Sequence, residues 1–199
     1  MTTKGGVKNV FGLLFDMTRC IGCKTCQIAC KDKNDLPIGT IYREISSYEG
    51  GEYPVLDVFH FSASCNHCEN PACVNACAAG AMYKTEEGPV LHDDDLCIGC
   101  GACVEACPYG VPKLLPDKGI SGKCDTCIAI RNNGFAPQCV SACPMRALDF
   151  GELEDLLAKY PGATPMALLP FLPESDTVPT TLVMAKECAY NDGMMKMDY

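Results

Sequence analysis

The stretch that decides the fold is CIGCKTCQIAC, residues 20–30, in which three cysteines are separated by two residues each and a fourth follows after three more. A second stretch, CIGCGACVEAC at residues 97–107, matches it at seven of eleven positions. Three thiolates at two-residue spacing can bind three corners of a four-iron cube, while the fourth cysteine points along a helical turn toward another cube. The spacing therefore predicts [4Fe–4S] clusters.

Two further groups complete the pattern: CNHCENPACVNAC at residues 65–77, and CDTC at 124–127 with CVSAC at 139–143. The endings CVNAC and CVSAC resemble each other, so the chain reads as a duplicated unit of two cysteine groups. Sixteen of the 17 cysteines belong to this system, and we expect the remaining one, Cys188, to be an unligated thiol. The candidate cofactor and metal ligands are Cys20, Cys23, Cys26, Cys30, Cys65, Cys68, Cys73, Cys77, Cys97, Cys100, Cys103, Cys107, Cys124, Cys127, Cys139 and Cys143.

Other uses of cysteine fit this spacing poorly. Zinc sites combine separated pairs into a tetrahedral set, which is a different pattern. Disulfides at these short separations would be strained, and a thioredoxin-like redox pair needs one motif rather than four. A structural zinc protein nevertheless remains an alternative class, which an iron and sulfide assay would test.

Composition limits the remaining possibilities. A chain of 199 residues suits one or two domains. The formal charge is −9, and four oxidised clusters with their thiolates would add roughly −8, which argues against binding nucleic acid or an anionic membrane surface. No apolar run approaches the roughly 20 residues of a membrane-spanning helix. No apolar run of signal-peptide length follows residues 1–9, so we expect no secretory leader.

Local patterns predict short elements. Residues 12–16, 55–61 and 89–92 read as strands, and the end of each cysteine group, such as residues 103–107, suits one or two helical turns that a proline then ends. Gly22 and Gly99 are expected to let the backbone approach a cube closely. Residues 152–160 have helical periodicity, and the proline-rich stretch that follows is expected to lie on the body or on a partner, especially residues 166–172.

Several polar residues accompany the cysteines. His67 lies inside the second group, but every cube corner already has a thiolate, so we expect a role beside the ligands or at the surface. Arg19, Lys24, Lys31, Lys123 and Arg131 flank the groups. They would either raise cluster potentials or offset the acidic surface, and the sequence leaves both possibilities open. No catalytic constellation and no dinucleotide-binding loop is present in the sequence.

The motifs together resemble a known family. DMTRCIGCKTCQIACKD at residues 16–32, SCNHCENPAC at 64–73, ACPYG at 106–110, KCDTC at 123–127 and CPMRALDFG at 143–151 resemble the four-cluster iron–sulfur subunits of molybdenum oxidoreductases. That family includes the electron-transfer subunit of dimethyl sulfoxide reductase. The resemblance covers about residues 12–155, most of the chain.

The resemblance implies a crosswise ligation that the spacing alone leaves open. One cube would take Cys20, Cys23, Cys26 and Cys143; a second Cys124, Cys127, Cys139 and Cys30; a third Cys65, Cys68, Cys73 and Cys107; and the last Cys97, Cys100, Cys103 and Cys77. Some relatives lose a cysteine of the third group and hold a three-iron cluster, but Cys100 is present here, so four full cubes are expected. Ala78 stands where a proline is more usual.

The implied fold is α+β, with tandem bacterial-ferredoxin-like lobes that are loop-rich and related by a pseudo-two-fold. Residues 1–60 with 113–150 would form the first lobe with two clusters, residues 61–112 an inserted second lobe with two, and residues 151–199 a C-terminal extension packed on the body or a partner. Because clusters would fill much of the interior, metal binding should supply folding energy, and the apoprotein should be largely unfolded.

The implied function is electron transfer without a catalytic site on this chain. Electrons would pass between a molybdopterin (bis-guanine-dinucleotide) catalytic subunit and either a quinone-reactive membrane subunit or a soluble donor. The complex is expected at the outer face of the cytoplasmic membrane by co-export with its partner, with the cytoplasm as the alternative. A free-standing polyferredoxin carrier is the competing function. The substrate, the direction of electron flow and the cluster potentials are not encoded in these motifs.

Overall fold

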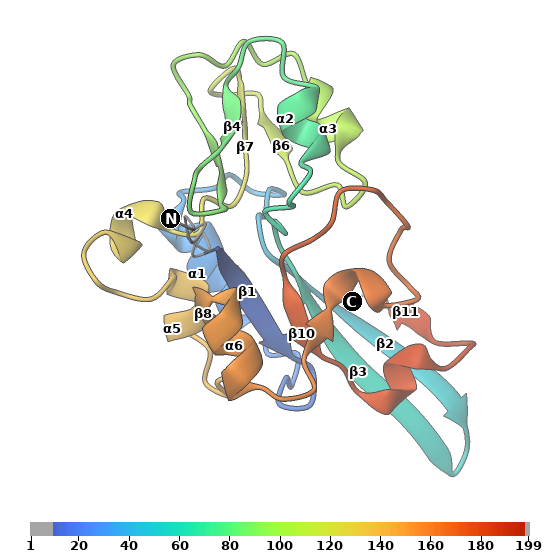
Figure 1. The fold of residues 1–199 in the computed structure, drawn as a ribbon. Helices are drawn as coiled ribbons and strands as arrows, with labels where there is room; N and C mark the ends of the chain where they lie inside the picture. Colours follow the sequence, from blue (N-terminus) through green and yellow to red (C-terminus); the bar gives the residue numbers. More distant parts are fainter. Residues whose placement is uncertain (1–9, 198–199) are drawn as a thin grey trace.

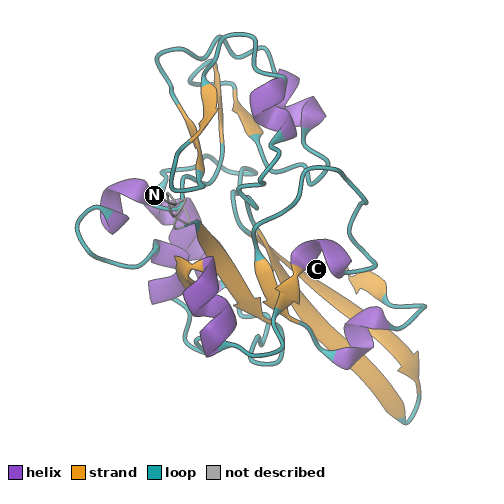
Figure 2. Cartoon of the chain, in the orientation of Figure 1, coloured by secondary structure: helices purple, strands orange, loops and turns teal. Residues whose placement is uncertain are grey.

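The computed structural model of the protein describes residues 10–197, and the expectation about a leader therefore falls largely on residues outside the described part. The chain folds into a mixed α+β structure of short helices and small sheets joined by long loops (Figures 1 and 2). We call residues 65–122 the hairpin lobe, which forms the upper part of Figure 1, and the other described residues the sheet body.

A four-stranded sheet with the order β8–β1–β10–β9 forms the centre of the sheet body. Strand β1 (Phe11–Asp16) pairs antiparallel with β8 (Leu148–Glu152) and parallel with β10 (Leu182–Met184), and β9 (Thr164–Pro165) extends the edge. The strand predicted at residues 12–16 is confirmed. Its last five residues are all buried, in keeping with an apolar run that is covered on both faces.

A second sheet of three strands, β11–β2–β3, extends from the body (Figure 1). Strands β2 (Glu44–Glu52) and β3 (Val55–Ala63) form a long antiparallel hairpin, and β11 (Met195–Met197) pairs with β2. The predicted strand at residues 55–61 is therefore confirmed. Rings of Tyr48, Phe59 and Phe171 pack with centroids 4.7–5.3 Å apart, which ties the hairpin to the C-terminal segment.

Four helices belong to the sheet body: α1 (Thr25–Lys33), α4 (Ile128–Arg131), α5 (Gln138–Ser141) and α6 (Leu153–Lys159). Helix α6 confirms the helix predicted at residues 152–160. Its first turn contains Glu154 and Asp155 and its last turn contains Lys159, a charge distribution that complements the helix dipole. Leu156 is the buried residue on its inner face.

The hairpin lobe consists of two short helices and two short hairpins. They are α2 (Ala72–Asn75), β4 (Met82–Lys84), β5 (Val90–His92), α3 (Ala102–Ala106), β6 (Lys113–Leu115) and β7 (Ile120–Gly122). Strand β5 confirms the prediction at residues 89–92, one residue shorter. The β6–β7 hairpin also contacts the body, because Leu115 packs with Cys30, Leu36 and Tyr42.

The C-terminal segment is more integrated than its sequence suggests. Met166 in η1 (Met166–Leu168) and Leu169 are 3% and 2% exposed and belong to the largest hydrophobic cluster of the described residues, while η2 (Glu187–Tyr190) contributes Ala189. Strands β10 and β11, which no sequence pattern predicted, complete both larger sheets. Within residues 10–197, no helix combines the length and apolar character needed to cross a membrane.

Candidate metal centres

The sixteen cysteines of the four groups line four separate cavities, four cysteines to each. We name them site A (Cys20, Cys23, Cys26, Cys143), site B (Cys30, Cys124, Cys127, Cys139), site C (Cys65, Cys68, Cys73, Cys107) and site D (Cys77, Cys97, Cys100, Cys103). This is the grouping that the family resemblance implied. Cys188 lines none of these cavities and packs beside the largest hydrophobic cluster.

Paired helices explain why the groups exchange their last cysteine. In the sheet body, α1 carries Cys26 and, one turn further on the same face, Cys30; the displacement along the helix places Cys26 in site A and Cys30 in site B. Helix α5 packs against α1 and places Cys139 in site B. Cys143 lies just after the end of α5 and lines site A. In the hairpin lobe, α2 and α3 repeat the arrangement with Cys73 and Cys103, followed by Cys77 and Cys107.

Gly22 and Gly99 both have a positive φ, of 70° and 67°, as tight cysteine loops require. Glycine is also required at both positions by close approaches within the chain itself. A Cβ on Gly22 would lie 2.7 Å from the ring of His60, and one on Gly99 would lie 2.3 Å from the carbonyl oxygen of Gly119. The loops are therefore fixed by packing against β3 and the β6–β7 turn.

The sites differ in their exposure to solvent. All four cysteines of site B are buried. Site C has two buried and two half-buried cysteines, whereas sites A and D each have one exposed cysteine, Cys23 and Cys100. Exposed apolar residues flank these two, since Ile21 is 56% and Ile98 is 72% exposed. Sites A and D thus reach the molecular surface, and site B does not.

Amide and hydroxyl groups point at the sulfurs. The N–H groups of Ala147, Thr126, Met82 and Ser121 donate to Cys143, Cys124, Cys77 and Cys97, with N···S distances of 3.3–3.5 Å. The hydroxyl of Thr25 also donates to the Sγ of Cys23 at 3.3 Å. Such donors stabilise thiolates, which are the form that binds metal.

Burial and hydrogen bonding move the thiol pKa values in opposite directions. Burial raises the pKa of Cys30 to about 12 and that of Cys73 to about 11. At Cys97, slight burial acts to raise the pKa of the thiol, but hydrogen-bond donors from Ser121 and Gly99 lower it to about 7. Burial therefore opposes thiolate formation at Cys30 and Cys73, and a positively charged metal group would offset that effect.

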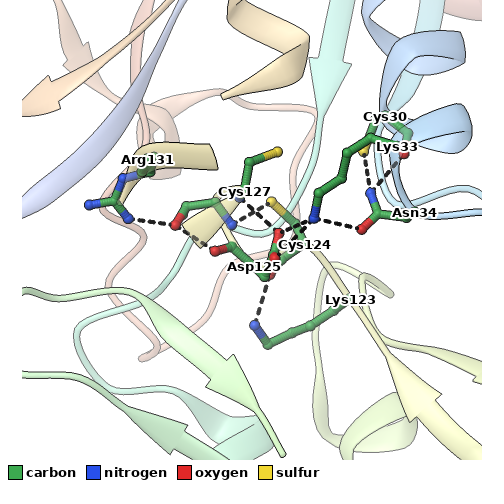
Figure 3. Close-up of polar contacts among 9 residues, drawn as sticks. Cys30, Lys33, Asn34, Lys123, Cys124, Asp125, Cys127 and Arg131 are labelled. Atoms are coloured by element: carbon green, nitrogen blue, oxygen red, sulfur yellow. Dashed lines mark hydrogen bonds and ion pairs between the residues drawn. The ribbon is translucent and has the colours of Figure 1, made fainter. Parts of the chain in front are cut away.

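Figure 3 shows the polar surroundings of site B. Asn34 donates through Nδ2 to the carbonyl oxygen of Cys30 at 2.7 Å and lies 3.6 Å from its sulfur. Lys33 forms an ion pair with Asp125 at 3.1 Å, and Lys123 donates through Nζ to the carbonyl oxygen of Cys124 at 2.9 Å. Lys123 is one of the flanking cations whose role the sequence left open. It is buried and donates a hydrogen bond to the backbone.

The residues present fit iron–sulfur clusters. Each cavity offers four sulfur donors, one for each corner of a cube. Two buried donors that line cavities have no hydrogen-bond partner among the described residues: Nε of Arg43 at site B and Nδ2 of Asn66 at site C. The cysteines do not converge on a point, for within residues 10–197 no three His, Cys, Asp or Glu side chains gather as the ligands of a single ion do.

The structure narrows the expected role of one residue near the sites, His67, and reveals a second, Arg43, that the sequence analysis did not identify. His67 is 4% exposed, which excludes the surface role and leaves the role beside the ligands; its Nδ1 accepts the N–H of Val90 at 3.0 Å, and burial holds its pKa well below the usual value. Arg43 was missed entirely. It lies 13 residues after Cys30 and 22 before Cys65, and no local motif marks it.

Comparisons with known proteins agree with this geometry. A sequence profile described as a 4Fe-4S dicluster domain matches residues 56–153, and one described as a 4Fe-4S binding domain matches residues 17–33. The chain is 44% identical over 168 residues to the B subunit of anaerobic dimethyl sulfoxide reductase of Escherichia coli, covering 80% of this chain and 82% of that protein. It is 40% identical over 192 residues to the corresponding subunit of Haemophilus influenzae, with 92% and 93% covered.

The chain thus belongs to the family of dimethyl sulfoxide reductase B subunits. The thiosulfate reductase electron transfer subunit of Salmonella typhi is also similar, at 42% identity over 150 residues, with 74% of this chain and 78% of that protein covered. These relatives are iron–sulfur electron-transfer subunits rather than catalytic subunits, and this chain shares that role. The predicted family, the [4Fe–4S] type of cofactor and the electron-transfer function are confirmed.

Proposed function

We propose that this chain holds four [4Fe–4S] clusters, one in each of sites A to D, and relays electrons through them within a reductase complex of anaerobic respiration. The observation that carries the proposal is the distribution of sixteen cysteines into four cavities of four. When bound, each cluster supplies one-electron redox chemistry. The chain's own residues bind it through thiolates, exclude water and direct N–H groups at the sulfurs.

Packing between the cysteines supports one order of the four sites along the path of the electrons. Cys26, Cys139 and Cys143 share a cluster of buried residues, which joins site A to site B. Cys65 of site C packs with Cys124 of site B and Val111. Cys73 of site C and Cys103 of site D also pack together. The order A–B–C–D follows, with the buried site B inside and the partly exposed sites A and D at the two ends.

The two ends suit two different partners. Exposed apolar side chains surround each end, including Ile21 and Met145 at site A and Leu96 and Ile98 at site D. One end would face a molybdopterin catalytic subunit of the bis-guanine-dinucleotide type, and the other a quinone-reactive membrane subunit or a soluble donor. The relatives named for dimethyl sulfoxide and thiosulfate reduction support such a complex. We propose that the complex lies at the outer face of the cytoplasmic membrane by co-export, with the cytoplasm as the alternative.

The helix pairs support a pseudo-two-fold relation between two ferredoxin-like lobes, residues 1–60 with 113–150 and residues 61–112, with residues 151–199 as an extension. The α1–α5 pair serves sites A and B, as the α2–α3 pair serves sites C and D. The β6–β7 hairpin lies at the boundary, since Leu115 packs toward site B while Ser121 approaches site D.

The test is an assay of iron and acid-labile sulfide on the complex purified anaerobically, combined with identification of its subunits. We expect about sixteen irons and sixteen sulfides per chain, and a co-purifying molybdopterin subunit. About eight irons would reject the count of four. A persistent monomer at native abundance would favour the competing function, a free polyferredoxin carrier.

A further inference from the structure

Arg43, immediately before β2, is a buried cation without an anionic partner. The residue is 2% exposed. Nη1 donates to the Oγ of Ser62 at 2.8 Å and to its carbonyl oxygen at 3.3 Å, and Nη2 donates to the Oγ of Ser64 at 2.8 Å. None of the ion pairs among the described residues includes Arg43, and its Nε has no hydrogen-bond partner there. A buried charge of this kind requires compensation from something negative nearby.

The groups around Arg43 that can carry negative charge are cysteine sulfurs. Arg43 lines the cavity of site B. Burial alone would lower its pKa, but the thiolates of Cys139, Cys26, Cys124 and Cys30 reverse that effect and raise it. Three of these belong to site B and one to site A. Ser62 extends the link to site A, since its Oγ lies 3.8 Å from the Sγ of Cys26.

Site D, at the other end of the proposed electron path, has no buried cation in its lining. The cavity of site D is lined by small, apolar and neutral polar side chains with His92, and no lysine or arginine is among its lining residues. Lys123, the other buried cation near a ligand, donates to the carbonyl oxygens of Val90 and Cys124 and lines site C. Arg43 is thus a buried cation that lines site B and reaches a ligand of site A through Ser62.

We infer that Arg43 sets the reduction potentials at sites B and A, raising the potential at B most. The inference rests on the proposed occupation of these sites by [4Fe–4S] clusters. An added electron makes a thiolate-bound site more negative by one charge. A fixed cation nearby stabilises that state, and the effect is strong because little water screens it. Arginine keeps its proton at any working pH, so the bias is permanent.

The test compares variants of the full chain in its native complex by redox titration followed by electron paramagnetic resonance. In Arg43→Gln, we expect one midpoint potential to fall clearly, a second to fall less, and the other two to stay unchanged. Arg43→Lys keeps the charge and should restore potentials close to those of the wild type. The matched control is Arg19→Gln: Arg19 lies next to Cys20 and pairs with Asp16 at 3.4 Å, but its side chain is 54% exposed. Solvent screening should leave all four potentials unchanged there.

Unchanged potentials in a fully loaded Arg43→Gln protein would overturn the inference. So would equal shifts in the Gln and Lys variants, because geometry rather than charge would then decide. If Arg43→Gln does not assemble, Arg43→Lys decides: wild-type iron content and potentials support a charge role, and failure of both variants makes Arg43 purely structural. A wild-type protein with too little iron would instead reject the four-cluster function itself, so the two failures are distinguishable.

Discussion

The sheet body and the hairpin lobe each supply two cysteine sites, yet they bury different side chains around them. The main cluster of the body contains fourteen buried residues, of which three are cysteines, and includes Phe15, Phe59 and Phe61. The corresponding cluster of the hairpin lobe contains four, Cys73, Met82, Val90 and Cys103, so half of it is sulfur ligand. The body has a core of its own, while the lobe depends on what its cysteines bind.

The largest expected effect is that of cluster removal. Chelation of iron under denaturant-free conditions should abolish the cooperative fold, because the hairpin-lobe elements of three to five residues cannot stabilise themselves. Loss of amide protection should be complete in residues 65–122 and less complete in β1, β8 and the β2–β3 hairpin. Hydrogen exchange measured by mass spectrometry on holo- and apoprotein checks this. Equal protection of both halves in the apoprotein contradicts the comparison.

Single ligands should differ with depth in the same way. Cys124→Ser removes a buried ligand of site B and should cost about four irons of about sixteen, together with contacts between body and lobe. Cys100→Ser removes the exposed ligand of site D and should cost less, down to about one iron. Iron analysis and far-ultraviolet circular dichroism measure both effects.

Cys188→Ser is the control for the ligand variants, because Cys188 lines none of the four cavities. It should retain the full iron content. Iron loss in this variant as large as in Cys124→Ser would contradict the assignment of Cys188 as an unligated thiol.

A smaller effect is expected from the two loop glycines. Gly99→Ala forces a Cβ to within 2.3 Å of the backbone oxygen of Gly119, and Gly22→Ala meets the ring of His60 at 2.7 Å, which can move. We expect Gly99→Ala to destabilise by about 2–4 kcal/mol and Gly22→Ala by about 1–2 kcal/mol, the second mostly from the positive φ. Thermal unfolding of the holoprotein measures both. Gly110→Ala, with φ 60° and open space, isolates the backbone cost.

The smallest effect concerns a charge pair of the body. Burial works to raise the pKa of Asp149, but hydrogen bonds from Lys159 at 2.6 Å and Tyr160 at 2.8 Å lower it overall. A lowered pKa in the folded state contributes stability above the ordinary carboxyl pKa, and that stability is lost as the pH falls through the folded value. Asp149→Asn should therefore destabilise by well under about 1 kcal/mol, since solvent screens the pair. The difference in melting temperature from the wild type should stay constant between pH 7 and pH 5.

The sequence predicted the parts of this fold that depend on neighbours along the chain. Strands at residues 12–16 and 55–61 and helix α6 were visible because period and composition act locally. Strands β10 and β11 were not, because β10 pairs with a strand more than 160 residues away in a segment interrupted by prolines. Arg43 escaped for the same reason, since only packing brings it beside Cys139 and Cys124.

The cysteine spacing by itself determined the chemistry of this protein. Two-residue and three-residue gaps place thiols where four-iron cubes need them, whatever surrounds them. The tertiary structure alone decided which sites are buried, which reach the surface, and which lie beside a fixed positive charge. Those properties depend on desolvation and on distances between residues far apart in sequence, and neither is encoded in the spacing of a motif.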